Sequence, residues 1–140
     1  MFDIEFLKTR IVSETGYPIE TMQSKEIIPR LDPGNICTVR VGYLNNNAMD
    51  ITSRAMTPGI NDQMWSDIIQ TIEVHFVTLE SNIPTVWKAL YNACCGFNYD
   101  PIEQEYSSLT YAEGGVIGID NGKYWWVDRW NISFPRVTNL

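Results

Sequence analysis

The sequence predicts a single α+β domain, in which helices pack on a mostly antiparallel β-sheet of about four to five strands. Three observations support this class. Residues 67–78 alternate in character with the two-residue period of a strand that has one face on the core. Asn121-Gly122 joins two strand-like runs, which indicates a β-hairpin. The stretches 2–14 and 83–94 carry apolar residues at helical spacing.

Length and charge limit the classes of function. We expect residues 1–140 to form one domain, since a chain of this length buries roughly two-thirds of its unfolded surface. The net charge of −7 argues against sequence-specific nucleic acid binding and against binding to anionic lipid. No apolar run approaches the ~20 residues of a membrane span, and the acidic start does not resemble a signal peptide. We therefore expect a protein that is cytosolic where it is made.

The three cysteines cannot all pair within the chain. Cys94 and Cys95 are adjacent, which is not the spacing of a metal-binding pair, and Cys37 is distant in sequence. We expect all three to be buried free thiols in a reducing compartment.

The first elements are a helix and a strand. Residues Phe2–Glu14 are predicted to be helical, with an apolar stripe that is more typical of core packing than of a partner groove, and Gly16 ends the helix. A turn at Asp32–Asn35 leads into a strand at Ile36–Leu44. One face of this strand is apolar, and Thr38 and Arg40 point the other way. The apolar face comprises Cys37, Val39, Val41 and Tyr43.

Residues 45–63 form an unusually long connection. The segment contains three consecutive asparagines, yet it also carries Met49, Ile51, Met56 and Ile60, which argue against simple disorder. Two interpretations remain open: an arm or β-ribbon that protrudes and packs on a partner, or a loop folded over its own domain.

The central strand is followed by a helix. On the strand, Ile72, Val74 and Phe76 share the face that we expect to meet the core. Ser81-Asn82-Ile83-Pro84 resembles a capped helix start, and Gly96 ends the helix. Its apolar face, which should cover the core side of the sheet, comprises Ile83, Val86, Trp87, Leu90 and Cys94.

The closing hairpin runs from Gly115 to Phe134, and Pro135 is expected to end it. Trp125 and Trp126 are neighbours, so they point to opposite faces of the second strand. An aromatic side chain on the second face suggests either another helix over that face or a subunit interface.

The sequence contains no recognisable catalytic motif. His75 is the single histidine, which excludes a paired-histidine metal site, and it is interpreted as a cross-strand or edge contact. The carboxylates of Asp100, Glu103 and Glu105 lack the spacing of a calcium loop and are interpreted as a solvated acidic face. We therefore expect no catalytic residues, no metal and no cofactor.

The order of these segments resembles that of the tail terminator (tail completion) proteins of long-tailed bacteriophages. In that family an N-terminal helix leads to a strand, an extended loop or hairpin, and then a strand with a tryptophan and an I-E-V-x-F run, here within Trp65–Phe76. A helix, a Tyr/Asp-rich stretch and closing strands follow. The corresponding residues here are Asn98–Asp100, Ser108–Tyr111 and Lys123–Phe134.

The resemblance implies a non-enzymatic structural protein of the virion, made in the host cytoplasm. Six copies would close into a ring on the end of the tail tube, stop its growth and join it to the head–tail connector or neck protein. The expected partners are other copies of the chain, the tail tube protein and the connector. The residues expected at the subunit or tube interface are Met49, Ile51, Arg54, Met56, Ile60 and Trp125.

Two alternatives remain at this point. The chain could be another neck or baseplate subunit of a virion. It could instead be a small ligand-binding α+β module, which would require Trp126 and Trp130 to line a cavity rather than fill a core.

Overall fold

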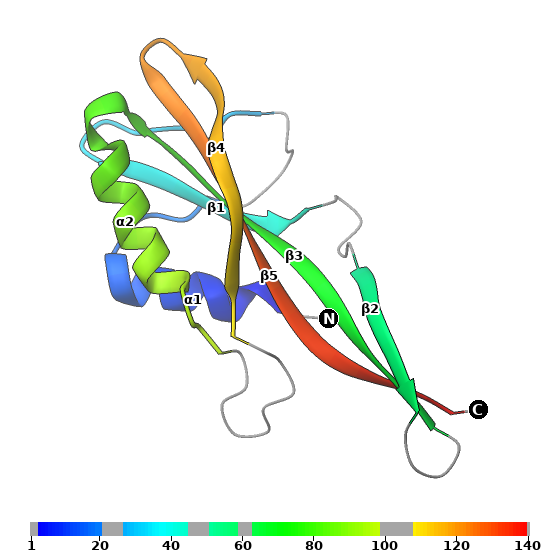
Figure 1. The fold of residues 1–140 in the computed structure, drawn as a ribbon. Helices are drawn as coiled ribbons and strands as arrows, with labels where there is room; N and C mark the ends of the chain where they lie inside the picture. Colours follow the sequence, from blue (N-terminus) through cyan, green and yellow to red (C-terminus); the bar gives the residue numbers. More distant parts are fainter. Residues whose placement is uncertain (1–2, 21–26, 45–50, 59–62, 99–107, 140) are drawn as a thin grey trace.

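The computed structural model describes residues 3–20, 27–44, 51–58, 63–98 and 108–139, and in 51–58, 63–68 and 134–139 it describes the backbone alone. The predicted α+β class is confirmed (Figure 1). The elements are α1 (Ile4–Thr15), β1 (Cys37–Tyr43), β2 (Ile51–Pro58), β3 (Gln63–Leu79), a 3₁₀ turn (Glu80–Asn82), α2 (Ile83–Cys94), β4 (Thr110–Asp120) and β5 (Lys123–Asn139).

β3 is the central strand of an antiparallel sheet, as predicted, although it begins at Gln63 rather than Asp67. One edge of β3 pairs with β5 along its whole length. The other edge pairs with β2 over residues 64–70 and with β1 over residues 72–78. β4 pairs with the first part of β5. The sheet is therefore β1-β3-β5-β4 at one end and β2-β3-β5 at the other.

The three-stranded end extends away from the helices (Figure 1). We call residues 51–58, 63–68 and 134–139 the arm. The predicted arm covered residues 45–63, and the parts at 45–50 and 59–62 lie outside the described residues. The part at 51–58 is strand β2. The arm is thus a piece of the main sheet, because β3 and β5 continue into it.

The prediction that Pro135 ends the last strand is wrong, since β5 continues to Asn139. Pro135 pairs with Asp67 of β3. Proline cannot donate a backbone hydrogen bond, so it is tolerated mainly on edge strands. Among the described strands, β4 leaves β5 after Asn131, and β5 is an edge strand from there on. The local sequence did not show where that edge begins.

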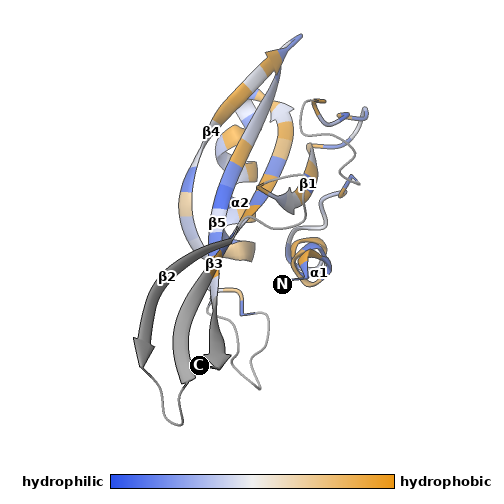
Figure 2. Ribbon diagram, turned by 90° about the vertical axis from the view of Figure 1, so that its right-hand side faces the viewer, coloured by the Kyte–Doolittle hydropathy of each residue, from blue (hydrophilic) through white to orange (hydrophobic). Residues whose placement is uncertain are grey.

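Both helices lie on one face of the sheet (Figures 1 and 2). Asp3 caps α1 by accepting a hydrogen bond from the Glu5 backbone N–H at 2.9 Å, and Gly16 ends it in the left-handed conformation. The side chain of Asn82 makes no capping hydrogen bond to α2, contrary to the prediction, because a 3₁₀ turn leads directly into the helix.

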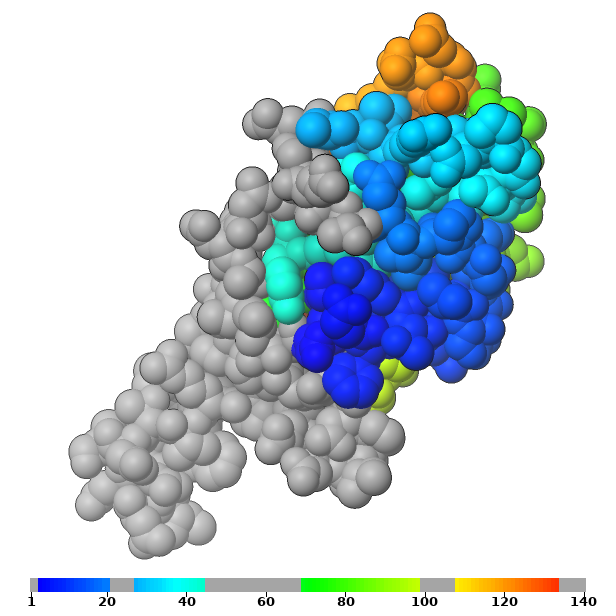
Figure 3. Space-filling model, turned by 180° about the vertical axis from the view of Figure 1, so that it is seen from behind, coloured from blue at the N-terminus to red at the C-terminus, as the bar shows by residue number. Residues whose placement is uncertain are grey.

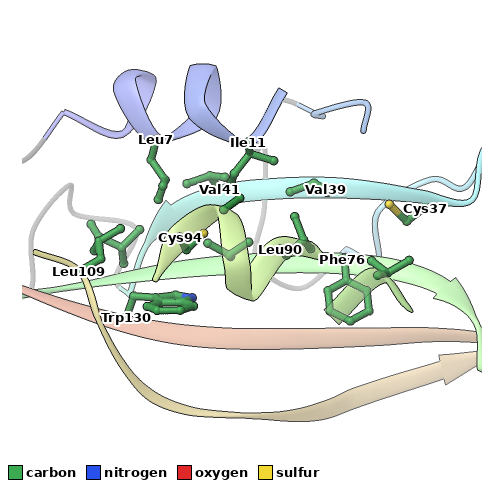
Figure 4. Close-up of a cluster of buried hydrophobic side chains, with 14 of the residues drawn as sticks. Leu7, Ile11, Cys37, Val39, Val41, Phe76, Leu90, Cys94, Leu109 and Trp130 are labelled. Atoms are coloured by element: carbon green, nitrogen blue, oxygen red, sulfur yellow. The ribbon is translucent and has the colours of Figure 1, made fainter. Parts of the chain in front are cut away.

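The core lies between the two helices and the sheet. Side chains of α1 and α2 meet those of β1, β3 and β5 in one cluster (Figure 4). The buried members are Leu7, Ile11, Cys37, Val39, Val41, Ile72, Val74, Phe76, Val86, Leu90, Ala93, Cys94, Leu109, Trp130 and Ile132. The predicted core faces of β1, β3 and α2 are therefore confirmed.

Two predicted turns form as their residues suggested. Asn121 and Gly122 both have positive φ, at 50° and 78°, as a type I′ hairpin requires. In the earlier turn the Asn35 N–H donates to the Asp32 carbonyl, and Gly34 has a φ of 90°.

β4 is one strand, where the sequence suggested separate runs at 108–111 and 115–120. Its register against β5 shifts between Tyr111 and Glu113 and again between Val116 and Gly118. Each shift inserts an extra residue, Ala112 or Ile117, so the strict two-residue alternation of a strand is lost.

Two of the three cysteines match the prediction. Cys37 and Cys94 are buried free thiols, and burial raises the pKa of each to about 12. Cys95 is a free thiol but it is exposed, because it follows the last residue of α2 and lies outside the apolar face of that helix.

A buried carboxylate lies between α2, β4 and β5. Asp128 Oδ1 accepts hydrogen bonds from Trp126 Nε1 at 2.8 Å, from Trp87 Nε1 at 3.2 Å and from the Tyr111 hydroxyl at 3.2 Å. Burial raises the pKa of Asp128, and the three hydrogen bonds oppose that rise. The donors offset part of the cost of placing a charge out of water.

Gly114 allows β4 to approach this carboxylate. A methyl group at Gly114 would overlap Asp128 Oδ1 and the Tyr111 hydroxyl. A methyl group at the neighbouring Gly115 would meet nothing within 4 Å. The two glycines are therefore adjacent in sequence but have different roles.

Gly114→Ala is expected to lower the free energy of unfolding by about 1–3 kcal/mol, because the added methyl group must displace a buried polar cluster. Gly115→Ala is the matched control and should change stability by less than about 0.5 kcal/mol. Urea unfolding followed by tryptophan fluorescence measures both. Equal effects at the two positions would show that β4 does not pack closely on Asp128.

Asp128→Asn should change how stability depends on pH. The folded-state pKa of Asp128 is raised above its ordinary 3.8, so the folded wild type binds this proton more readily than the unfolded chain. The tighter binding of this proton stabilises the folded wild type at low pH, and that stabilisation is lost as pH rises from about 3.8 through the folded pKa. Acidification through that window should therefore favour the wild type over the variant. Unfolding curves at several pH values test this, and a constant difference between the two proteins would contradict it.

Candidate assembly interface

The face of the sheet opposite the helices is covered at its four-stranded end. Thr38 donates to the Arg30 carbonyl at 2.7 Å, and Arg40 Nη1 donates to the Ile27 carbonyl at 2.7 Å. Arg40 also pairs with Glu20 at 2.9 Å. An irregular segment that includes residues 27–30 therefore lies over this face, instead of the helix or second subunit that the sequence suggested.

Trp125 lies on this second face, as predicted, but its side chain is 8% exposed. Its indole Nε1 donates to His75 Nδ1 at 3.1 Å, and the Arg40 guanidinium lies 6.0 Å from the indole ring. Little of Trp125 remains for a neighbouring subunit. The tryptophan is an internal residue of the isolated chain, because a charged side chain and a loop cover the sheet where the sequence suggested an open face.

His75 has partners on both ring nitrogens. An indole N–H can only donate, so Nδ1 must accept the bond from Trp125 and the proton sits on Nε2. Nε2 lies 3.2 Å from Glu73 Oε1. Glu73 Oε2 in turn pairs with Arg129, which pairs with Glu113. The predicted cross-strand contact of His75 is therefore confirmed, within a chain of polar contacts that ends at the surface.

The remaining interface residues belong to the predicted arm. Met49 and Ile60 lie outside the described residues. Ile51, Arg54 and Met56 lie on strand β2. The register of β2 against β3 shifts between Ser53 and Met56, so Arg54 lies at a β-bulge. The structure places these three residues on one strand, and Trp125 lies in a separate part of the sheet.

An exposed apolar surface on β4 was missed by the sequence reasoning. Val116, Ile117 and Ile119 are 44%, 50% and 61% exposed. We call these three residues the β4 strip. Among the described strands, β4 pairs on one edge alone, with β5. The apolar run V-I-G-I is visible in the sequence, but the strand pairing was needed to place it on an edge, where apolar residues need a cover.

The two tryptophans of the ligand-binding alternative pack against other side chains. Trp130 is fully buried in the core cluster, and Trp126 stacks on Phe76 with ring centroids 6.1 Å apart. Neither lines either of two hollows on the described surface. A hollow of about 540 Å³ lies beside α1, whose surface is blue in Figure 3, and one of about 190 Å³ lies over Gly114 and Gly115.

The described residues contain no group of three or more histidine, cysteine or acidic side chains placed to hold a metal ion. The acidic residues Asp100, Glu103 and Glu105 lie outside them. Neither of the two described helices has the length and apolar character needed to cross a membrane.

A comparison of the chain with models of known protein families finds no match, and a comparison with curated protein sequences finds none either.

Trp125→Ala is expected to destabilise the isolated chain by about 3–5 kcal/mol, because it removes a buried indole and leaves His75 Nδ1 without its donor. Ile119→Ala, on the β4 strip, should cost less than about 0.5 kcal/mol because that side chain is mostly in water. Urea unfolding of the monomer gives both values. A small effect at Trp125 would show that the indole contributes little to the isolated chain, and would favour its role as an interface residue.

Proposed function

We propose that this protein is a non-enzymatic structural subunit of a virion that acts like a tail terminator. Six copies close into a ring on the end of the tail tube. The ring contacts the tail tube protein on one side and the head–tail connector or neck protein on the other.

The arm is the observation that carries this proposal. The core cluster joins both helices to the sheet at its four-stranded end. The arm continues the same hydrogen-bonded ladder beyond the helices (Figure 1). Neither described helix covers this three-stranded extension (Figure 1). Such an extension suits contact with a second protein, because half-buried sheets are stable when one face is covered.

The order of elements also supports the proposal. The chain has a helix, a strand, an arm strand, a long central strand, a helix and a closing strand pair. The tail terminators that the sequence resembles have their elements in the same order. The one histidine has both ring nitrogens bonded within the chain. This arrangement suits a structural residue better than a general base, which needs a free nitrogen facing its substrate.

A ring needs two different patches on each subunit, one for each neighbour. The arm and the β4 strip lie at opposite ends of β5. Each apolar side chain buried between subunits would contribute about 1.5–3 kcal/mol before the cost of association is subtracted. A few such contacts at each junction, repeated around a closed ring, are enough for assembly at micromolar concentration.

Replacing Met49–Ile60 by a Gly-Ser linker is expected to abolish the ring and leave the monomer folded. The replacement removes β2, while β3 keeps its pairing with β5 and β1. Native mass spectrometry of the wild type at micromolar concentration should show six times the 16.1 kDa subunit mass, and the variant should show the monomer alone. The thermal transition of the variant should match that of the wild-type monomer.

The replacement is made with two Gly-Ser linkers, one short and one of the original length. If both abolish the ring, the cause is the lost contact; if the short linker alone does so, the cause is strain in the connection. A wild type that stays monomeric, alone and mixed with tail tube subunits, would overturn the ring. A variant that assembles normally would remove the arm from the interface.

A further inference from the structure

We propose that the β4 strip is the docking site for the arm of a second copy of this chain. This inference rests on the proposed ring and names the two surfaces that meet in it.

The β4 strip is a concentrated apolar surface. Val116, Ile117 and Ile119 lie within four residues of one edge strand, and hydrophobic segments run along β4 toward the hairpin in Figure 2. Elsewhere in the described chain the exposed large apolar residues are more widely spaced. Clustered exposed apolar residues on an edge strand mark a contact site.

The charges around the strip argue against a second β4 as its partner. Exposed acidic residues stand on either side of it: Asp120 at one end, and at the other Glu113, which also pairs with Arg129 of β5 at 2.8 Å. An antiparallel pair of β4 strands that sets Val116 opposite Ile117 would set each Glu113 opposite an Asp120. Like charges placed directly opposite each other are destabilising. The two bulges at Ala112 and Ile117 also interrupt a regular edge, so a neighbour meets side chains rather than a continuous hydrogen-bonded ladder.

The arm has the complementary charge. Its charged residues are Arg54, Asp67 and Arg136, so it is net positive in a chain of net charge −7. On β2 itself Arg54 is the single charged residue, beside the apolar Ile51 and Met56. An apolar segment that carries a positive charge fits an apolar strip with acidic flanks.

A hollow beside the strip adds room for a side chain. Gly114 and Gly115 line this space of about 190 Å³, with Val127 and Arg129 from β5. Gly115 has nothing within 4 Å of the position that a side chain would take. A small apolar group from the neighbour's arm can therefore approach the backbone of β4 here.

The placement of the two surfaces gives a head-to-tail contact. The strip lies against β5 residues 124–126, and the arm contains β5 residues 134–139. Because the two surfaces lie at opposite ends of one subunit, each copy can use its arm on one neighbour and offer its strip to the other. Such heterologous contacts generate a closed ring when the rotation between subunits is suitable.

Ile119→Asp tests the strip, with Val12→Asp as the matched control. Ile119 is 61% exposed and Val12 on α1 is 49% exposed, so neither aspartate should unfold the monomer. The concentration for half-assembly, measured by native mass spectrometry over a dilution series, should rise about tenfold or more for Ile119→Asp. It should change less than about twofold for Val12→Asp. Thermal unfolding checks that both monomers remain folded.

Charge reversal provides a second, independent measurement. Arg54→Glu should weaken assembly, and adding Asp120→Arg to the same chain should restore most of the loss, since the attractive pair is re-formed with its signs exchanged. A wild type that remains monomeric, both alone and mixed with tail tube subunits, overturns both this inference and the proposed ring. A wild-type ring in which Ile119→Asp assembles as well as Val12→Asp, or in which Asp120→Arg gives no rescue, overturns the docking site and leaves the ring standing.

Discussion

The long ladder between β3 and β5 is the interaction on which the rest of the structure depends. Both strands have 17 residues, and they pair from Gln63–Asn139 at one end to Leu79–Lys123 at the other. The further strands pair with its outer edges: β1 and β2 with β3, and β4 with β5. Because side chains alternate along both strands in register, the ladder also decides which residues meet the core and which meet the second face.

Each face of the ladder holds a buried carboxylate, and specific hydrogen bonds or ion pairs stabilise each of the two. On the helix side Asp128 is surrounded by aromatic donors, and on the other side Glu73 is held by Arg129 and His75. A buried carboxylate without such partners would cost several kcal/mol. These groups therefore favour one register of β5 on β3, because a shift of one residue would move each of them to the opposite face.

Several features follow from local sequence because their cause is local. The alternation in residues 67–78 identified the central strand, since a period of two residues is a property of one strand. Asn121-Gly122 identified the hairpin because few residue pairs adopt positive φ at both positions. Gly16 and Gly96 marked the ends of both helices for the same reason. The core faces of α2 and β1 were readable because each is apolar at its own period.

The tertiary structure alone decided which surfaces are covered. Trp125 looked available for a partner and is buried, because Arg40 and the loop containing Ile27 lie over its face. The β4 strip is exposed because β4 is an edge strand, and nothing in the local sequence indicated that position. The sequence determined the elements and their inward faces, since propensity and periodicity act within a few residues. Exposure depends on contacts between residues far apart in the chain, and no local pattern encodes them.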